Sequence, residues 1–463
     1  MSWWTLLPPV LAIALAIWKR EVILALLVAI FSAEWLLADF NIALGLLNTT
    51  ERIVAVFQSA GNTRILLFSL LIGALLMLIQ RSGGVSAFVQ WVAHKGLANT
   101  PRKVGMLPAI MGILIFIETN LSVLTSGILA RNLFDKFNMS RERLAFIIDS
   151  TCAPVSVLIV LNAWGAYILG LLSDYPISTN QVLLSSIPLN FYAVTTLGLV
   201  FYTVLTNRVH GPMKRIEHHR REVPLEQLEP ATHKRYMLLP LGTMIGSIIG
   251  FMWYTGATAI NSASPWQVSL SEGILNGSGS KAVLWGTVLG LLCAYLLIKF
   301  QGKQRHKTLI NWSFEGMGRL LGLVTTVLLA LALGSSMKAL GTGAFVAQMI
   351  GEHLPIWTVT PMIFIAAGVI SFTTGTSWGT FGILIPIGIP VAQSMGIPAE
   401  LILAAILGGG VFGDHCSPIS DTTIVSSLAA GCDHLDHVKT QLPYALTAGA
   451  VTLAGYTLAS LFF

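Results

Sequence analysis

Charged side chains are scarce in this 463-residue chain. Asp, Glu, Lys and Arg together make up only 10% of the residues, and 54% of the residues are hydrophobic, whereas a soluble globular domain carries about 25% charged residues. The mean hydropathy is +0.75. This composition excludes an ordinary soluble domain and predicts an all-α polytopic membrane protein. The net charge of +6 indicates no nucleic-acid partner, because the basic residues cluster in loops, where they set membrane orientation.

Cysteines and catalytic motifs are also few. The four cysteines (Cys152, Cys293, Cys416 and Cys432) show neither a metal-ligand spacing nor a disulfide framework. The chain lacks both the Walker A lysine motif and a Gly-x-Ser-x-Gly nucleophile motif. We therefore expect no enzyme activity and no cofactor. The first residues lack a basic region and a cleavage site, so we expect them in the first span.

Long apolar runs predict about ten transmembrane helices, since a span needs about 20 apolar residues. They lie near 3–18, 22–38, 64–80, 144–172, 186–206, 237–257, 281–300, 320–341, 399–430 and 441–462. Two further apolar stretches, 103–137 and 356–396, are each interrupted by a polar cluster. We expect each half to be too short to cross, and the two stretches to form re-entrant hairpins.

The basic residues predict how the chain is oriented. If Lys19 and Arg20 face the cytoplasm, every Lys and Arg falls in a cytoplasmic segment except Arg52, Arg64, Lys281 and Lys338. We therefore expect a multi-pass protein of the bacterial inner (cytoplasmic) membrane, with both termini external. The polar residues 207–236 are interpreted as a cytoplasmic linker between two repeat halves, 1–206 and 237–463.

An internal repeat is indicated by two short segments. Thr-Cys-Ala-Pro-Val-Ser at 151–156 resembles His-Cys-Ser-Pro-Ile-Ser at 415–420, with Cys, Pro and Ser matching at a constant offset of 264. Each copy follows a hairpin and a helix. We expect an inverted repeat with two discontinuous helices, broken at Pro154 and Pro418, because paired interrupted helices form the binding sites of many transporters.

Polar residues within the apolar run near residue 414 indicate the site. Residues 413–421 read Gly-Asp-His-Cys-Ser-Pro-Ile-Ser-Asp, and ionisable groups at membrane depth are expensive and usually functional. The Asp414 carboxylate can bind a cation or a proton but not both, which couples opposite fluxes of the two. The alternative is that Asp414 is an N-cap or a partner of His415.

Other candidates follow from the chemistry of sodium, which prefers hard oxygen ligands. The further acids are Glu118, Asp149 and Asp421; each either carries the proton or has a structural role, Asp421 as a helix cap. The ion-binding hydroxyl and amide candidates are Thr119, Asn120, Ser156, Thr374, Thr376, Ser377, Ser417 and Ser420, or else ordinary helix-capping groups. The predicted Na+ ligands are Thr119, Asn120, Thr374, Thr376 and Asp414. His415 is a candidate pH-modulating residue, and Asn162 and Trp164 either line a solute pocket or pack in the core.

The segment from Gly413 to Thr423 resembles the NhaC family of Na+/H+ antiporters. Ser426-Ser427, Cys432-Asp433-His434 and the run from Gln441 to Tyr444 are similar too. The resemblance implies a scaffold domain and a transport domain, a homodimer, and elevator-type movement. It also leaves the substrate open, because the family includes carriers of amino acids and organic acids. The alternatives are therefore Na+/H+ antiport, Na+- or H+-coupled transport of a small organic solute, and a channel or receptor.

Overall fold

The computed structural model describes residues 3–19, 21–94, 99–173, 175–217, 230–353 and 355–462, and within these ranges the chain contains helices and no strand. The α-helices are α1 (Leu7–Lys19), α2 (Val22–Leu37), α3 (Ile42–Ala55), α4 (Ala60–Arg81), α5 (Gly84–His94), α6 (Pro101–Leu114), α7 (Thr119–Lys136), α8 (Arg141–Leu158), α9 (Ala163–Leu172), α10 (Thr179–Ser186), α11 (Phe191–Thr206), α12 (Pro212–Ile216), α13 (Arg235–Ile260), α14 (Leu270–Leu275), α15 (Gly279–Phe300), α16 (His306–Arg319), α17 (Leu321–Leu340), α18 (Thr342–His353), α19 (Val359–Thr374), α20 (Ser377–Met395), α21 (Ala399–Cys416), α22 (Asp421–Ala430) and α23 (His434–Ala459). The all-α membrane fold is confirmed. Part of the expected linker, 218–229, lies outside the described residues.

Eight described helices are long and apolar enough to cross a membrane, or nine if the bent pair α8–α9 counts as one span. The stretches Ile356–Thr374 and Ser377–Met395 are among them, at 19 residues each. The prediction that each half of 356–396 is too short to cross is therefore wrong, since 19 helical residues extend about 28 Å. The corresponding arms of the first hairpin, α6 and α7, do not qualify. Helices α1 and α2 correspond to two of the ten expected spans, but they count only as shorter apolar helices of 10–17 residues.

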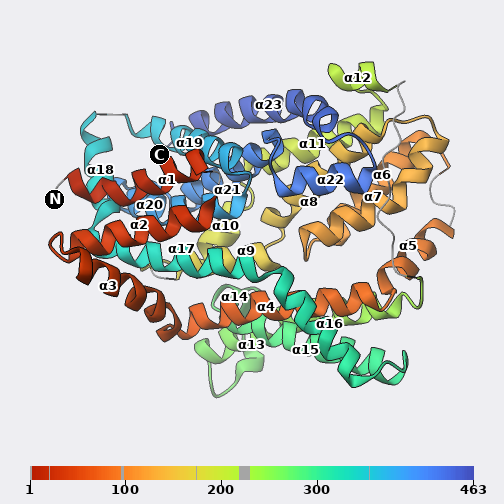
Figure 1. Cartoon of the computed structure of the whole chain (residues 1–463), viewed down its shortest axis with the longest axis horizontal. Helices are drawn as coiled ribbons and strands as arrows, with labels where there is room; N and C mark the ends of the chain where they lie inside the picture. The colour runs from red at the N-terminus through yellow and green to blue at the C-terminus, as the bar shows by residue number, and fades with distance from the viewer. Residues whose placement is uncertain are drawn as a thin grey trace.

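The helices form layers with separate apolar cores. Helices α4, α13, α15 and α16 pack together at one side of the molecule, and α19, α21 and α23 lie at the other (Figure 1). Helix α17 lies between these layers and packs against α2, α4 and α20. The two hairpins, α6–α7 and α19–α20, pack against the interrupted helices α8 and α21, respectively. The hairpin tips are thereby brought to the breaks in those helices.

The repeat is visible in the lengths and positions of the helices. Helices α8 and α21 are both 18 residues long, and α9 and α22 are both 10 residues long. The start of α8 (Arg141) and the start of α21 (Ala399) are 258 residues apart, and the same offset relates the starts of α5 and α18, α7 and α20, and α9 and α22. The predicted offset of 264, which paired Cys152 with Cys416, is therefore wrong by six residues. With the offset of 258, Asp414 is equivalent to Ser156, whereas the predicted offset of 264 would pair it with Ser150.

The first break does not lie at Pro154. Pro154 is inside α8, which continues to Leu158, and the break occupies residues 159–162 with a bend of 42°. Proline removes one amide donor and kinks a helix, but here the helix continues for another turn. The second break, residues 417–420, does contain Pro418 as predicted. Two discontinuous helices are present, but the first is interrupted after Leu158 and not at Pro154.

Asn162 holds the first break together. Its Nδ2 atom lies within hydrogen-bond distance of the carbonyl oxygens of Ser156 and Ile159, both at 2.9 Å, and of Phe116 at 3.1 Å, and its two hydrogens are shared among these three acceptors. Its Oδ1 atom accepts from the amide of Gly165 and so caps α9. One buried amide therefore satisfies the end of α8, the start of α9 and the tip of the first hairpin. Asn162 does not belong to the walls of the cavity described below.

Candidate functional site

Both hairpin tips and the second break face one cavity of about 670 Å³. The sequence-predicted site residues in its walls are Glu118, Thr119, Asn120, Trp164, Thr374, Thr376, Asp414 and Asp421. The opposite wall comes from α4, α16 and α17, including Ile72, Arg319 and Thr326. All five predicted Na+ ligands therefore line the same space, which lies between two groups of helices.

Asp414 lies in the last turn of α21, and its side chain is 3% exposed. Its Oδ2 atom accepts a hydrogen bond from Ser377 Oγ at 2.6 Å. Its Oδ1 atom is buried and has no hydrogen-bond partner among the described residues. Asp414 is thus not an N-cap, and His415 bonds instead to the hydroxyl of Tyr192, at 2.9 Å from its Nδ1 atom. A buried carboxylate oxygen without a donor is costly.

The first repeat has a neutral counterpart of this contact. The residues equivalent to Ser377 and Asp414 are Thr119 and Ser156, 258 residues earlier, and their hydroxyl oxygens lie 3.2 Å apart. Ser156 also donates to the carbonyl of Cys152 at 2.8 Å. The same fold position therefore holds a carboxylate in one repeat and a hydroxyl in the other.

The tip of the first hairpin is built around Glu118. Its Oε2 atom accepts from the amide of Leu121 at 2.6 Å and caps α7, and its Oε1 atom accepts from Asn120 Nδ2 at 3.1 Å. Glu118 is therefore a capping residue whose carboxylate also faces the cavity. A carboxylate at a helix N-terminus is stabilised by the helix dipole.

The second tip is docked against the second break. Gly375 has a left-handed backbone (φ +69°), and a Cβ there would overlap the carbonyl oxygen of Ile419. Thr376 precedes α20 and contributes no capping hydrogen bond, while the hydroxyl of Thr374 donates to the carbonyl of Ile370 at 2.8 Å. The close approach of the backbones at Gly375 and Ile419 couples the position of this tip to that of the break.

The serines of the second break have separate structural partners. Ser417 Oγ donates to the carbonyl of Phe372 at 2.7 Å, and Ser420 is the N-cap of α22. Asp421 therefore occupies the first turn of α22 and is not its cap; it is exposed to the cavity. A hydroxyl that donates to a carbonyl keeps its oxygen lone pairs for a cation.

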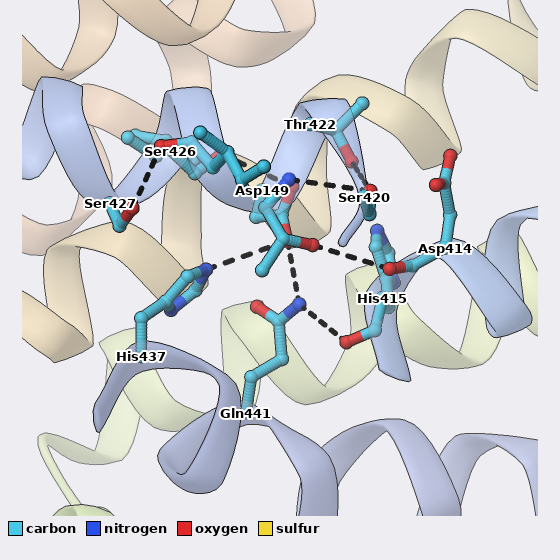
Figure 2. A network of polar contacts seen from close by, with 12 residues as sticks. Asp149, Asp414, His415, Ser420, Thr422, Ser426, Ser427, His437 and Gln441 are labelled. Atoms are coloured by element: carbon cyan, nitrogen blue, oxygen red, sulfur yellow. Dashed lines mark hydrogen bonds and ion pairs between the residues drawn. The ribbon is translucent and has the colours of Figure 1, made fainter. Parts of the chain in front are cut away.

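Asp149 and His415 lie outside the cavity walls and belong to a buried polar cluster with Gln441 and His437 from α23 (Figure 2). The sequence analysis identified Asp149 and His415 but not their partners from α23, because His437 and Gln441 lie nearly 300 residues after Asp149 in the chain. It also missed other residues of the cavity walls, among them Glu21, Arg319 and Trp378. The packing of Trp164 against Trp378, with ring centroids 5.4 Å apart and the rings tilted by 55°, has no signature in sequence.

Oxygen atoms dominate the donor set around Asp414. Within the residues that the structure describes, no group of three or more His, Cys, Asp or Glu side chains is placed to hold a metal ion. The cavity instead offers the carboxylates of Glu21, Glu118, Asp414 and Asp421, several hydroxyls, and the backbone of an interrupted helix. Of these carboxylates, Asp414 has a buried oxygen without a hydrogen-bond partner among the described residues. This is the chemistry that suits an alkali cation or a proton.

Comparison with known proteins gives a consistent result. A sequence profile described as the Na+/H+ antiporter family matches residues 163–461. An uncharacterised protein of Haemophilus influenzae is 32% identical over 98% of this chain and 90% of its own length. A malate-2H+/Na+-lactate antiporter of Bacillus subtilis is 34% identical over 28% of this chain and 30% of its own length. An arginine/ornithine antiporter of Halobacterium salinarum is 32% identical over 30% of this chain and 29% of its own length.

Solved structures share the fold at low sequence identity. The YdaH transporter of Alcanivorax borkumensis has a TM-score of 0.61 and 15% identity, over 90% of this chain and 88% of that one. The MtrF structure from Neisseria gonorrhoeae has a TM-score of 0.52 and 12% identity, over 89% and 84%. At these identities the similarity shows the fold alone.

Proposed function

Because this chain belongs to the Na+/H+ antiporter family and is a secondary transporter of the membrane, we propose that it exchanges Na+ for H+ at Asp414. The observation that carries the proposal is the buried Oδ1 atom of Asp414, which has no hydrogen-bond partner among the described residues and belongs to a side chain that lines the cavity. A sodium ion requires the ionised carboxylate, whereas a proton neutralises it. Since one site cannot hold both, the arrival of one ion releases the other.

The predicted ligands support this exchange. Thr119 and Asn120 from the first tip, Thr374 and Thr376 from the second, and Asp414 from the break all line the cavity. Oxygen ligands from separate elements surround an ion only while those elements stay docked together. In this proposal no chemical bond is made or broken in the transported species, so no catalytic residue or cofactor is needed, and Na+ and H+ are the transported partners.

We further propose alternating access by an elevator-type movement. The position of the cavity supports it, because one wall belongs to α4, α16 and α17 and the other to the hairpin tips and α22. The first group would be the scaffold and the second the moving unit. A homodimer in the bacterial inner membrane, with both termini external and the repeat halves 1–206 and 237–463 joined by a cytoplasmic linker, belongs to the same proposal.

A second candidate function is Na+- or H+-coupled transport of a small organic solute. The size of the cavity favours it, since about 670 Å³ lies within the range of small-molecule pockets and far exceeds one ion. Two relatives are named as antiporters of organic acids or of amino acids. The two functions share the role of Asp414 and differ in what else enters the cavity.

Everted membrane vesicles separate the two functions. For antiport, Na+ added to vesicles with a preformed proton gradient dissipates the gradient without any organic solute. Asp414→Asn abolishes this response, and Glu400→Gln, on the same helix, leaves it intact. If Na+ has no effect until malate, lactate, arginine or ornithine is supplied, antiport alone is refuted and the second function is supported. Wild-type exchange by Asp414→Asn refutes the assigned site.

A further inference from the structure

We propose that Asp149 and His437 form a proton-binding site behind the cavity, coupled to Asp414 through the hydroxyl of Thr423. The inference rests on the proposed cation exchange at Asp414 and adds to it a second place where a proton is held. No residue of this second site lines the cavity.

The geometry of the pair is that of a proton-sharing acid and base. Asp149 and His437 are both fully buried, and His437 Nε2 lies 3.6 Å from Asp149 Oδ2. The Asp149 carboxylate also accepts from Gln441 Nε2 at 2.6 Å and from Ser426 Oγ at 3.1 Å. Figure 2 shows these side chains converging on Asp149 from α22 and α23. A protonated imidazole here is paired with a carboxylate, and a neutral imidazole leaves the carboxylate with hydrogen bonds alone.

Unpaired polar atoms mark the site as incomplete. Among the described residues, both ring nitrogens of His437, His415 Nε2 and Gln441 Oε1 are buried and without a hydrogen-bond partner. Buried polar atoms are nearly always satisfied, so these four atoms around one carboxylate have hydrogen-bonding capacity left to take up a further hydrogen. One proton fits this place: it binds the imidazole of His437, and the positive charge of the ring then pairs with the Asp149 carboxylate.

The site is connected to Asp414 through shared hydrogen bonds. Thr423 Oγ1 lies 3.4 Å from Asp149 Oδ2 and 3.2 Å from the carbonyl oxygen of Asp414. A hydroxyl has one hydrogen and can serve only one of these acceptors at a time. When His437 is protonated it compensates the charge of Asp149, and the Thr423 hydrogen is free to turn to the Asp414 carbonyl. Gln441 makes a second link, because its Nε2 atom also donates to the carbonyl of His415 at 3.0 Å.

The ionisable groups around the pair come from four elements. They are Asp149 on α8, Asp414 and His415 on α21, His437 on α23, and Tyr192 on α11, whose hydroxyl bonds to His415. Tyr192 bonds to Nδ1 of His415, and Nε2 of that ring stays without a partner among the described residues. Asp414 and Asp149 therefore compete for positive charge: Asp414 receives it from an ion in the cavity, and Asp149 receives it from a protonated His437.

The repeat argues against a purely structural role for this carboxylate. The residue 258 positions after Asp149 is Leu407, which is buried in the equivalent helix α21. The fold builds that helix around an apolar side chain, so it does not require a charged residue at this position. The carboxylate is thus present in one repeat only, although its partners His437 and Gln441 come from the other half of the chain. A charge that the repeated helix does not need is expected of a functional group and not of a scaffold element.

The test is proton release on Na+ binding by the purified full-length protein in weakly buffered detergent solution with a pH-sensitive dye. Wild type releases protons on addition of NaCl and not of choline chloride. We expect His437→Gln and Asp149→Asn to reduce the protons released per Na+ bound at least twofold, with the Na+ affinity within threefold of wild type. His306→Gln, which removes an imidazole far from the site, is the control and should match wild type.

Thr423→Val is the second variant, because it keeps both sites and should fold even if Asp149→Asn does not. We expect its Na+ binding to persist while the pH dependence of Na+ affinity becomes at least threefold shallower. Unchanged proton release in His437→Gln together with an unchanged pH dependence in Thr423→Val overturns the inference and leaves the proposed function standing. Absence of Na+ binding to the wild type overturns both.

Discussion

Ser377 donates a hydrogen bond to Asp414 across 2.6 Å, and it joins the second hairpin tip to the end of α21. The equivalent residues of the first repeat, Thr119 and Ser156, lie 3.2 Å apart and make the same junction without a charge. At this junction one copy of the structural unit holds an ionisable group where the other holds a hydroxyl. That difference makes the second junction the one on which ion affinity is expected to depend.

Ser377→Ala should weaken Na+ binding by about 10- to 100-fold, since a hydrogen bond to a charged group contributes about 1.5–3 kcal/mol. The measurement is the Na+ concentration for half-maximal dissipation of a proton gradient in everted vesicles. Thr373→Val removes a hydroxyl that donates to the carbonyl of Val369 and lies outside the cavity walls. It is the matched control and should change that concentration less than threefold. Equal effects of the two substitutions would contradict the role assigned to the Ser377 hydrogen bond.

Asn162→Ala should destabilise the protein by about 2–4 kcal/mol. The change removes a helix cap worth about 1 kcal/mol and leaves buried carbonyls unpaired at about 1–3 kcal/mol. The melting temperature of the purified protein measures the effect. Asn276→Ala, at an exposed loop position, should leave the melting temperature within 1–2 °C of wild type, because such surface changes stay within about 0.5 kcal/mol. A stable Asn162→Ala protein would show that another group holds the first break.

Gly375→Ala should reduce transport at least tenfold. A methyl group there meets the Ile419 carbonyl and pushes the second tip away from the break. Gly396→Ala is a matched control, because Gly396 has the same left-handed backbone (φ +70°) with no atom within 4 Å of a Cβ. Both variants bear the cost of a left-handed alanine, about 1 kcal/mol, and only the first loses the docking of the tip. Equal transport by the two variants would show that tip contact is unimportant.

The ion pair between Glu315 on α16 and Arg81 at the end of α4 should produce a pH-dependent contribution to stability. The hydrogen bond from Arg81, at 2.8 Å, lowers the pKa of Glu315 below its ordinary value of 4.5. A lowered carboxyl pKa contributes stability that is present above the unfolded-state pKa and is lost as the pH falls through the folded-state pKa. The melting temperature of Glu315→Gln should therefore be below that of wild type at pH 7 and approach it below pH 4.

The contribution of Glu315 is expected to be small, because the side chain is 35% exposed and solvent screens surface pairs. Measurement of both proteins at pH 7 in 0.1 and 1 M choline chloride gives the control, since salt should reduce the difference. A difference that grows as the pH falls would have the wrong sign and would exclude the ion pair as its source.

The position of the site could be predicted from sequence because polar residues in apolar segments are rare and expensive. That reasoning correctly located both hairpin tips, Asp414 and the break at Pro418. The register of the repeat could not be obtained in the same way. Cys152-x-Pro154-x-Ser156 matches Cys416-x-Pro418-x-Ser420 by residue type. The structural equivalence follows instead from the lengths and starts of the helices, and almost none of the residues that it pairs are identical.

The sequence predicts the first break at Pro154 because proline often interrupts a helix, and this position is wrong. Pro154 is accommodated within α8, and the helix ends where the side chain of Asn162 can take over the free carbonyls. A lone asparagine has no signature that distinguishes this role from packing. The Asp149 cluster is a similar case, since its partners His437 and Gln441 are brought to it only by the packing of α8 against α23.

The Oδ1 atom of Asp414, which has no hydrogen-bond partner among the described residues, also has a consequence for uncoupled movement of the empty carrier. An ionised carboxylate that protein atoms solvate on only one side is ill suited to cross hydrocarbon alone. The moving unit would therefore reorient only when an ion or a proton has neutralised the group, and slippage of the empty carrier would be suppressed. Tight coupling in this protein would then follow from the absence of a hydrogen-bond donor to the Asp414 Oδ1 atom among the described residues.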